Sequence, residues 1–151
     1  MRIIVLGLFV AALSFSTRTE ALSHGNLGVQ AARDARGYVF TFRRCDNSSR
    51  GASFLLFEVE EVQQDGRGRL ICEVDYQGED GHQPTTDPKW RYGQVPPGYT
   101  VRADIGCKPL EPEKTYRIGA TAGGVSGGGL FRLDKRGVPI LVLDTCTAES
   151  R

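Results

Sequence analysis

The residues that could do chemistry in this sequence are a glycine-dense run, a few carboxylate pairs, two histidines and four cysteines. Glycine-rich loops can hold phosphate on backbone N–H groups, but they need a helix after the glycines, and the Walker type also needs a Lys-Ser or Lys-Thr pair. After residues 123–129 (GGVSGGG), the chain continues in a strand-like pattern with Leu130, Phe131 and Arg132. We therefore expect no phosphate site, and interpret the run as a mobile connection between two strands, in which glycines supply positive φ.

Paired carboxylates can hydrolyse glycosidic bonds when they flank a cleft. The pairs in this chain are Glu60 with Glu61, Glu73 with Asp75, and Glu79 with Asp80. Neighbouring residues on a strand point to opposite faces, so Glu60 and Glu61 cannot converge without a bulge. Glu79 and Asp80 lie between glycines, as in a solvated loop. No catalytic residue is therefore predicted, and the protein is not expected to be an enzyme.

Two groups of residues could bind a metal. Glu79, Asp80 and His82 would offer an oxygen-rich cation site with one imidazole. If the chain were cleaved after Ala21, the new terminus would carry a third-position histidine, His24, which completes a square-planar nitrogen set for Cu(II) or Ni(II) with Leu22 and Ser23. Any protein with a third-position histidine has this set, so we predict neither a metal site nor a cofactor.

The first 21 residues have the features of a secretory signal peptide. Arg2 precedes an apolar run at residues 3–13, and Thr19 and Ala21 are small residues suited to a cleavage site. The run is shorter than the roughly 20 residues that span a bilayer. We expect a mature protein of residues 22–151, secreted or periplasmic, that is not inserted in a membrane.

The four cysteines, Cys45, Cys72, Cys107 and Cys146, agree with that compartment. An even number of cysteines in an exported chain indicates disulfides, with three possible connectivities. Structural zinc sites use closely spaced pairs, which this chain lacks. A catalytic thiol would need a histidine partner, and only His24 and His82 exist.

Charge excludes one class of partner. The formal net charge is +1, and without residues 1–21 the basic and acidic residues are equal in number and interspersed. Nucleic-acid binding would need a basic patch or stripe, so none is predicted.

The hydrophobic pattern has period two over most of the chain, which predicts strands. In YVFTFRR, for example, Tyr38, Phe40 and Phe42 share one face. Turn signals such as DNSSRG, QDGRG, VPPG and DKRG separate the apolar runs. One helix-compatible piece, LGVQAARDAR, precedes the first clear strand. We predict a single all-β domain over residues 22–151: an antiparallel sandwich of seven or eight strands.

One motif refines this expectation. In LEPEKTYRIGATA, Leu110, Pro112 and Tyr116 follow the order L-x-P-x-x-x-Y, which resembles the tyrosine corner of fibronectin type III and related immunoglobulin-like sandwiches. The resemblance implies that the Tyr116 hydroxyl bonds to backbone just upstream and that these three residues specify the crossing between sheets.

A second stretch holds the only tryptophan. In KWRYGQVPPGYTV, Trp90, Tyr92 and Tyr99 surround a Pro-Pro-Gly turn, a pattern that resembles small exported bacterial proteins of unassigned function. The three aromatic side chains are a possible contact surface for a protein, a peptide or a glycan. In the alternative, Trp90 fills the core and Tyr92 caps it.

Strand positions favour one disulfide pairing. Cys72 shares its strand face with core residues, and Cys107 precedes the tyrosine corner, so we predict Cys72–Cys107. Cys45 and Cys146 each follow a strand and would form the second bond. We expect a disulfide-stabilised binding or structural module; the alternatives are an inhibitor or immunity-type protein that blocks an exported partner and a small exported hydrolase.

Overall fold

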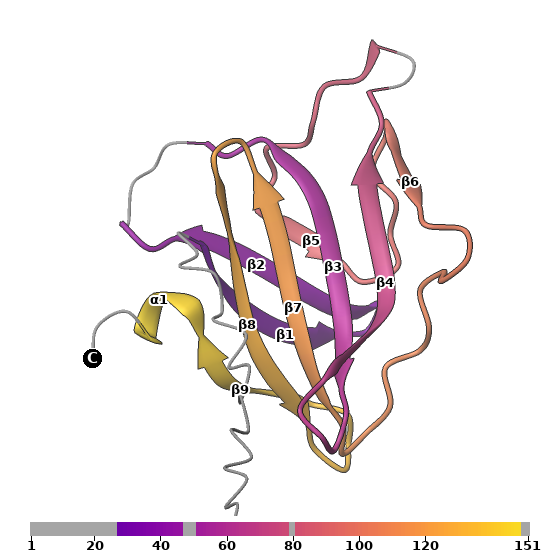
Figure 1. Cartoon of the computed structure of the whole chain (residues 1–151), viewed down its shortest axis with the longest axis vertical. Coiled ribbons are helices and arrows are strands. Elements are labelled where there is room, and N and C mark those ends of the chain that lie inside the picture. Colours follow the sequence, from indigo (N-terminus) through magenta and orange to yellow (C-terminus); the bar gives the residue numbers. More distant parts are fainter. Residues whose placement is uncertain (1–26, 47–50, 79–80, 149–151) are drawn as a thin grey trace, which may run out of the picture.

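The computed structural model describes residues 27–46, 51–78 and 81–148 (Figure 1). The predicted signal peptide, the Leu22 terminus with His24, and Glu79 and Asp80 lie outside these residues. The described residues form nine strands and one short helix. Their bounds are β1 Leu27–Asp34, β2 Gly37–Arg44, β3 Phe54–Val62, β4 Gly68–Tyr76, β5 Lys89–Arg91, β6 Tyr99–Val101, β7 Thr115–Ala122, β8 Val125–Leu133, β9 Pro139–Asp144 and α1 Thr145–Ala148.

The prediction of an almost entirely β chain is confirmed, but the first segment corrects one detail. The helix-compatible piece LGVQAARDAR begins with strand β1. Val29 is buried, Ala31 is partly buried, and the intervening Gln30 is exposed. A helix of this length is marginal by itself, whereas β1 pairs with β2 along its whole length, from Leu27↔Arg44 to Asp34↔Gly37. Pairing therefore overrides helix propensity.

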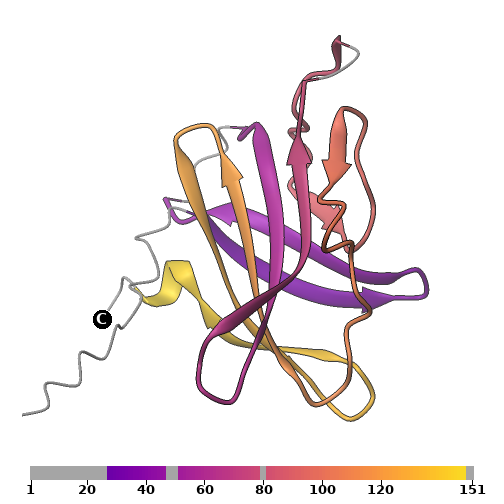
Figure 2. The same ribbon diagram turned by 45° about the vertical axis from the view of Figure 1, so that its right-hand side comes forward.

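The strands form one mixed sheet in the order β5-β2-β1-β8-β7-β3-β4-β6, with β9 paired to β8 outside this path. β1 and β8 run parallel and the other pairs are antiparallel, so the predicted purely antiparallel pairing is wrong. The sheet curls so that β1, β2 and β5 cross behind β3, β7 and β8 (Figures 1 and 2). The curl brings two inner faces together.

Aromatic side chains fill the space inside the curl. Trp90 of β5 stacks on Phe57 of β3 with ring centroids 5.1 Å apart, and Phe40 of β2 lies 5.2 Å from Phe131 of β8. Tyr116 of β7 stacks on Phe131 at 5.6 Å. All five are buried, and each contributes about 1.5–3 kcal/mol by leaving water.

One edge of strand β8 pairs with two different strands, β1 and β9. Residues 127 and 128 pair with Leu27 and Gly28 of β1, and residues 129–133 pair with β9. We call residues 127–129, together with Gly28 and Asp144, the branch point. A Cβ on Gly128 would lie 1.9 Å from the carbonyl oxygen of Ile118. Only glycine lets the neighbouring backbones approach this closely.

The branch point corrects the interpretation of the glycine run as a mobile connection. The connection is a two-residue turn, Gly123 and Gly124, because Ala122 pairs directly with Val125. Residues 127–129 belong to β8, where Gly127 has a φ of 152° and a Cβ there would lie 2.3 Å from the Leu27 carbonyl oxygen. Shortening residues 123–129 to two residues would therefore remove part of a strand.

Both predicted disulfides are present. Cys45–Cys146 joins the end of β2 to α1, and Cys72–Cys107 joins β4 to the segment before β7. Cys72 is fully buried and forms an isolated antiparallel bridge with Cys107. Because each bond links segments distant in sequence, each lowers the conformational entropy of the unfolded chain and so stabilises the folded state.

Candidate binding site

Strand β9 and the residue before it carry four of the six exposed large apolar side chains of the described chain. The exposed fractions are 47% for Val138, 54% for Ile140, 43% for Leu141 and 60% for Val142. Among the described strands, β9 pairs only with β8, so its other edge has no partner. A contiguous apolar edge is unusual on a monomeric surface and indicates an interaction site or an aggregation hazard.

The exposure follows from the register of β9 on β8. Ile140 lies opposite Arg132 and faces outward, whereas Leu141 lies opposite the buried Phe131. The register shifts between Leu130 and Phe131, so Val142 is an extra residue in β9, a bulge without a direct partner. The bulge turns successive apolar side chains away from the core.

The turn before β9 fixes where the strand begins. The Asp134 carboxylate accepts hydrogen bonds from the backbone N–H groups of Arg136 and Val138, both at 2.8 Å. Gly137 provides the positive φ, 75°, that closes the turn. The Asp134 carboxylate is therefore already hydrogen-bonded to the backbone of its own turn.

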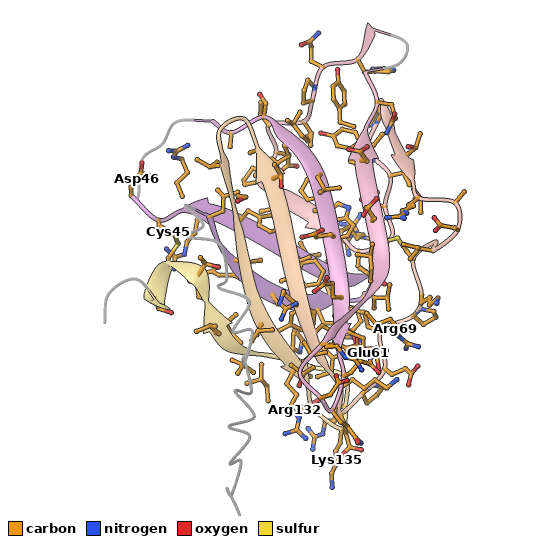
Figure 3. The ribbon with its side chains drawn as sticks, viewed as in Figure 1. Cys45, Asp46, Glu61, Arg69, Arg132 and Lys135 are labelled. Atoms are coloured by element: carbon orange, nitrogen blue, oxygen red, sulfur yellow. A yellow bond between two sulfur atoms is a disulfide. The ribbon has the colours of Figure 1, made fainter. Side chains whose placement is uncertain are left out.

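Three cations lie beside the start of β9. Arg132, Lys135 and Arg136 are exposed, and none makes an ion pair with a described residue. Figure 3 shows Arg132 and Lys135 together at the lower end of the molecule. We define the β9 surface as the four exposed apolar residues of this segment with these three cations.

The other end of β9 is anchored at the branch point. Asp144 is 5% exposed and accepts hydrogen bonds from the N–H groups of Val29 and Cys146, each at 3.3 Å, and from the Arg43 guanidinium. The Thr145 hydroxyl donates to the Gly128 carbonyl at 2.7 Å and accepts from the Gly128 N–H at 3.2 Å. β9 is thus held at both ends.

The aromatic residues predicted as a contact surface lie elsewhere. Trp90 and Tyr99 are only 2% and 6% exposed, so their side chains form part of the core. The Trp90 indole donates to the Gln94 carbonyl at 2.9 Å. Tyr92 is partly buried, donates to the Lys108 carbonyl at 2.5 Å, and has a raised pKa because of its burial. The structure therefore agrees with the alternative in which Trp90 fills the core.

The tyrosine-corner residues adopt the geometry that the resemblance implied for the hydroxyl. Tyr116 is 1% exposed, and its oxygen accepts a hydrogen bond from the Glu111 N–H at 2.7 Å. Leu110 packs against the core, and Pro112 is exposed. The hydrogen bond fixes the segment that enters β7.

One half-buried carboxylate was not among the pairs considered from the sequence. Glu58 lies opposite Glu73 on one side and Gly119 on the other. Burial raises its pKa, and the charges of Glu60 and Glu73 add to the effect. The adjoining cavity is about 120 Å³, below the roughly 300 Å³ of small-molecule pockets. The alternation in FLLFEVEEV predicts that Glu58 lies on the outer face of its strand. Its neighbours on β4 and β7 depend on strand pairing, which the sequence does not show.

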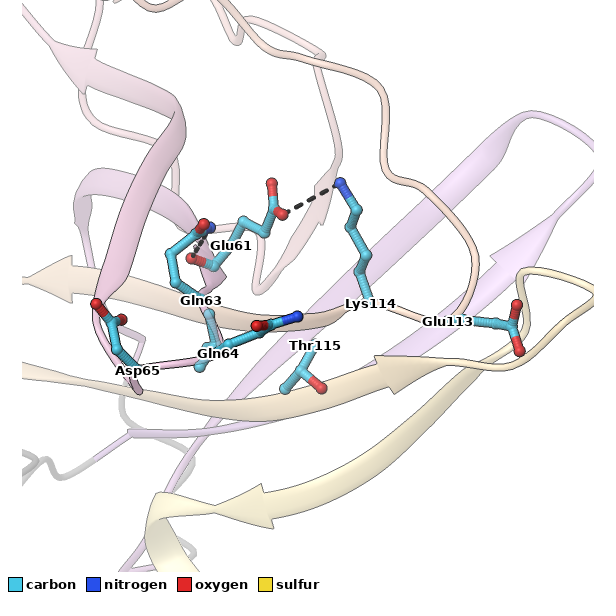
Figure 4. Close-up of a pocket in the computed structure, with 8 residues that line it drawn as sticks. Glu61, Gln63, Gln64, Asp65, Glu113, Lys114 and Thr115 are labelled. Carbon is cyan, nitrogen blue, oxygen red and sulfur yellow. Dashed lines mark hydrogen bonds and ion pairs between the residues drawn. The ribbon is translucent and has the colours of Figure 1, made fainter.

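A larger hollow lies between the β3–β4 hairpin and the start of β7 (Figure 4). Its volume is about 800 Å³, and Glu61, Lys114 and Asp65 line it. These charges are already neutralised: Lys114 contacts Glu61 at 3.1 Å and Glu111 at 2.8 Å, while Asp65 pairs with Arg67. The Arg69 hydrogen bond is the largest cause of the lowered pKa of Glu61. Glu113 also lines the hollow and makes no ion pair with a described residue, so the hollow offers a ligand a single unpaired carboxylate.

Two further features concern metals and membranes. Within the described ranges, no three His, Cys, Asp or Glu residues cluster as metal ligands do. His82 lies in a described loop, but its predicted partners Glu79 and Asp80 fall outside the ranges. The helices of the described chain include none long and apolar enough to cross a membrane.

The sequence predicted β9 as a strand but did not predict its exposure. VPILVL is a continuous apolar run, which is typical of a strand buried on both faces. The available signal was the adjacent basic turn, DKRG, together with the absence of any charge within the run.

Comparison of the chain with family models, curated proteins and solved structures found no match.

Proposed function

We propose that this protein is an exported, disulfide-stabilised β module that binds another protein through the β9 surface. The observation that carries the proposal is the contiguous row of exposed apolar residues on an unpaired edge, from Val138 to Val142. Exposed apolar area costs solubility, and protein-binding sites are a common reason for a chain to keep it.

The compartment in the proposal is supported by the two disulfides and the sequence of residues 1–21. Disulfides persist in the periplasm and outside the cell, where thiol reductants do not keep cysteines reduced. Intact-mass measurement on protein from the native host tests this part. A mature chain beginning at Leu22 supports export, and a retained Met1 contradicts it.

The proposal favours binding over catalysis. The inhibitor or immunity-type role expected as an alternative is a form of binding and would use the same surface. A hydrolase is the competing class, and Glu58 with its raised pKa is the carboxylate best suited to act as a general acid. Hydrolysis of model glycosides that Glu58→Gln abolishes would favour the hydrolase.

We also propose, as a separate point, a relationship to immunoglobulin-like and fibronectin type III sandwiches. The Tyr116–Glu111 hydrogen bond supports it, while the parallel β1–β8 pair departs from the antiparallel pattern of those folds. The single continuous sheet is a second departure. Tyr116→Phe tests the motif: a loss of about 1 kcal/mol in the free energy of unfolding would support its fold-specifying role, and unchanged stability would contradict it.

Site-specific photo-crosslinking tests the binding function. A photoreactive residue replaces Val142 in the full chain expressed in its native host, and the matched control carries it at Val95, which is 42% exposed but outside the β9 surface. We expect one protein to crosslink at position 142 and not at 95, and to bind again when purified. Equal crosslinking at both positions would contradict the proposal.

A further inference from the structure

We propose that β9 accepts an extended, acidic segment of the partner protein as an additional antiparallel strand. This refinement rests on the protein-binding function proposed above and specifies the chemistry of the partner. Its basis is the combination of an uncharged strand edge that no other described strand covers with cations at one end of that edge that make no ion pair with a described residue.

The edge itself is suited to strand addition. The sheet path ends in β5 and β6, which are only three residues long, and β5 carries Lys89 and Arg91. Short strands and charges are the usual means of blocking an edge. In contrast, β9 has six residues and no charge before Asp144; the blocking features that it has are Pro139 at its start and the bulge at Val142. An added strand would gain main-chain hydrogen bonds along this edge.

The charges beside β9 select the partner. On the outer face of β3, β4 and β7, cations are paired: Arg69 and Lys114 with Glu61, Arg102 with Glu73, and Arg117 with Glu60. Beside β9, Arg132, Lys135 and Arg136 have no such partners among the described residues. The nearby acids are Asp134, which bonds its own turn, and Glu113, whose N–H donates to Leu133. Arg33, whose guanidinium donates to the Arg136 carbonyl at 2.7 Å, adds a fourth cation to this turn. Four cations thus lie beside two acids, and an acidic partner would restore the balance.

The same charges disfavour a second copy of this chain. Antiparallel pairing of two β9 strands would bring the basic turn of one copy to the end of β9 in the other. The described carboxylates at that end are Asp144, which is buried and paired with Arg43, and Asp46, which is paired with Arg44. The basic turns would then meet no free described carboxylate. A chemically different partner is therefore favoured.

The position of the cations also sets the direction of the segment. Lys135 and Arg136 precede β9, so they lie at its N-terminal end. In an antiparallel arrangement this end faces the C-terminal end of the added strand, and antiparallel pairing is slightly the more stable. The partner segment should therefore be apolar first and acidic afterwards.

Fluorescence anisotropy with synthetic peptides tests this inference on the disulfide-bonded mature chain. The probe is a labelled peptide with six alternating valines and threonines followed by three glutamates. We expect it to bind, and to bind about tenfold more weakly when lysines replace the glutamates or when the order is reversed. Equal binding of all three peptides would overturn the inference.

Two controls separate strand addition from simple apolar contact. N-methylation of alternate peptide amides should abolish binding in one pattern and spare it in the other, because only one edge of the peptide faces β9. Val142→Lys should weaken binding about tenfold, whereas Val95→Lys should not. Identical effects of the two methylation patterns would overturn strand addition.

The remaining outcomes distinguish this inference from the proposed function. Crosslinking at Val142 without any peptide binding would keep protein binding at β9 and refute the acidic added strand. A dimer detected by sedimentation and abolished by Val142→Lys would show that a second copy covers the edge, and would refute the inference. Peptide binding that is unchanged in Val142→Lys would show that the peptide binds away from β9 and would refute the inference, while crosslinking at position 142 still decides the proposed function.

Discussion

The branch point and the β9 surface are neighbours along one strand, yet they use their polar groups in opposite ways. At the branch point, Asp144 and Thr145 bond to backbone amides, to an arginine and to a carbonyl within the same chain. On the β9 surface, apolar side chains face solvent, and three cations have no partner among the described residues. A region with all its groups paired serves the fold, and a region with unpaired groups is available for binding.

The largest expected effect concerns the bond that closes the branch point. Replacing Cys45 and Cys146 by serine should lower the free energy of unfolding by about 4–5 kcal/mol, from the loop-entropy relation for a long closed loop. The sequence separation is 101 for this bond and 35 for Cys72–Cys107. The second pair should therefore cost about 4 kcal/mol when replaced. Denaturant unfolding of both double variants makes the comparison, and a larger loss for Cys72 with Cys107 would show that the branch point is not the more constrained region.

The next effect separates the two halves of the glycine run. Gly128→Ala should destabilise the protein by more than about 3 kcal/mol, because the new methyl group would meet the Ile118 carbonyl oxygen and the backbone would have to move. Gly123→Ala is the matched control, since a Cβ there has no atom within 4 Å. Thermal unfolding measures both. Similar melting temperatures for the two variants would mean that the strands at the branch point are not tightly packed.

Asp144 tests how much the branch point depends on charge. Asp144→Asn should cost about 2–3 kcal/mol, because the Arg43 guanidinium loses its anionic partner and the N–H groups of Val29 and Cys146 donate to a weaker, neutral acceptor. Arg43→Gln serves as the partner variant, and the double variant completes a cycle. A coupling energy near zero in denaturant unfolding would contradict a role for this ion pair.

Glu58, which lines the cavity beside the branch point, should have the opposite effect: its replacement should raise the free energy of unfolding. Its folded-state pKa is raised above the ordinary 4.5, so the protonated form favours folding and stability falls as the pH rises through the folded pKa. Glu58→Gln should remove this pH dependence and stabilise the protein at neutral pH by about 0.5 kcal/mol, the size of an unfavourable cross-strand pair. Unfolding curves at acid and neutral pH measure the difference. A less stable variant at neutral pH would indicate an unrecognised partner for the carboxylate.

The smallest effect on stability is expected on the β9 surface. Val142→Thr should change the free energy of unfolding by less than about 0.5 kcal/mol, because the side chain is 60% exposed and buries little apolar area. The same variant should lose binding or become more soluble. A loss of more than 2 kcal/mol, roughly a buried methyl-rich side chain, would place Val142 in the fold rather than in an interface.

The sequence predicted the parts of the fold that follow from local pattern. Alternation identified the strands. The strand face of Cys72, the place of Cys107 before the tyrosine motif, and the positions of Cys45 and Cys146 after strands predicted both disulfides. The tyrosine motif predicted the hydrogen bond of Tyr116. These features depend on residues near each other or on one strand face, which a sequence displays directly.

Other features arise only when distant segments meet. Glycine weakens an isolated strand, so the sequence favours a connection at residues 127–129. In the structure, these residues instead pair with β1 and β9. Glu58 has unusual surroundings because β4 and β7 flank it. The exposure of β9 depends on its bulge and on the lack of a second described strand beside it, and VPILVL alone predicts neither.

The parallel pairing of Leu27 with Gly127 also constrains how the chain can fold. Synthesis proceeds from the N-terminus, so β1 is among the first strands made and β8 among the last. Until β8 emerges, β1 can pair only with β2, and its second edge stays open. Such non-local closure slows folding and prolongs the time in which unpaired strands can associate wrongly. Cys146 follows β9 in the chain. The Cys45–Cys146 bond can therefore form only after all nine described strands have been synthesised.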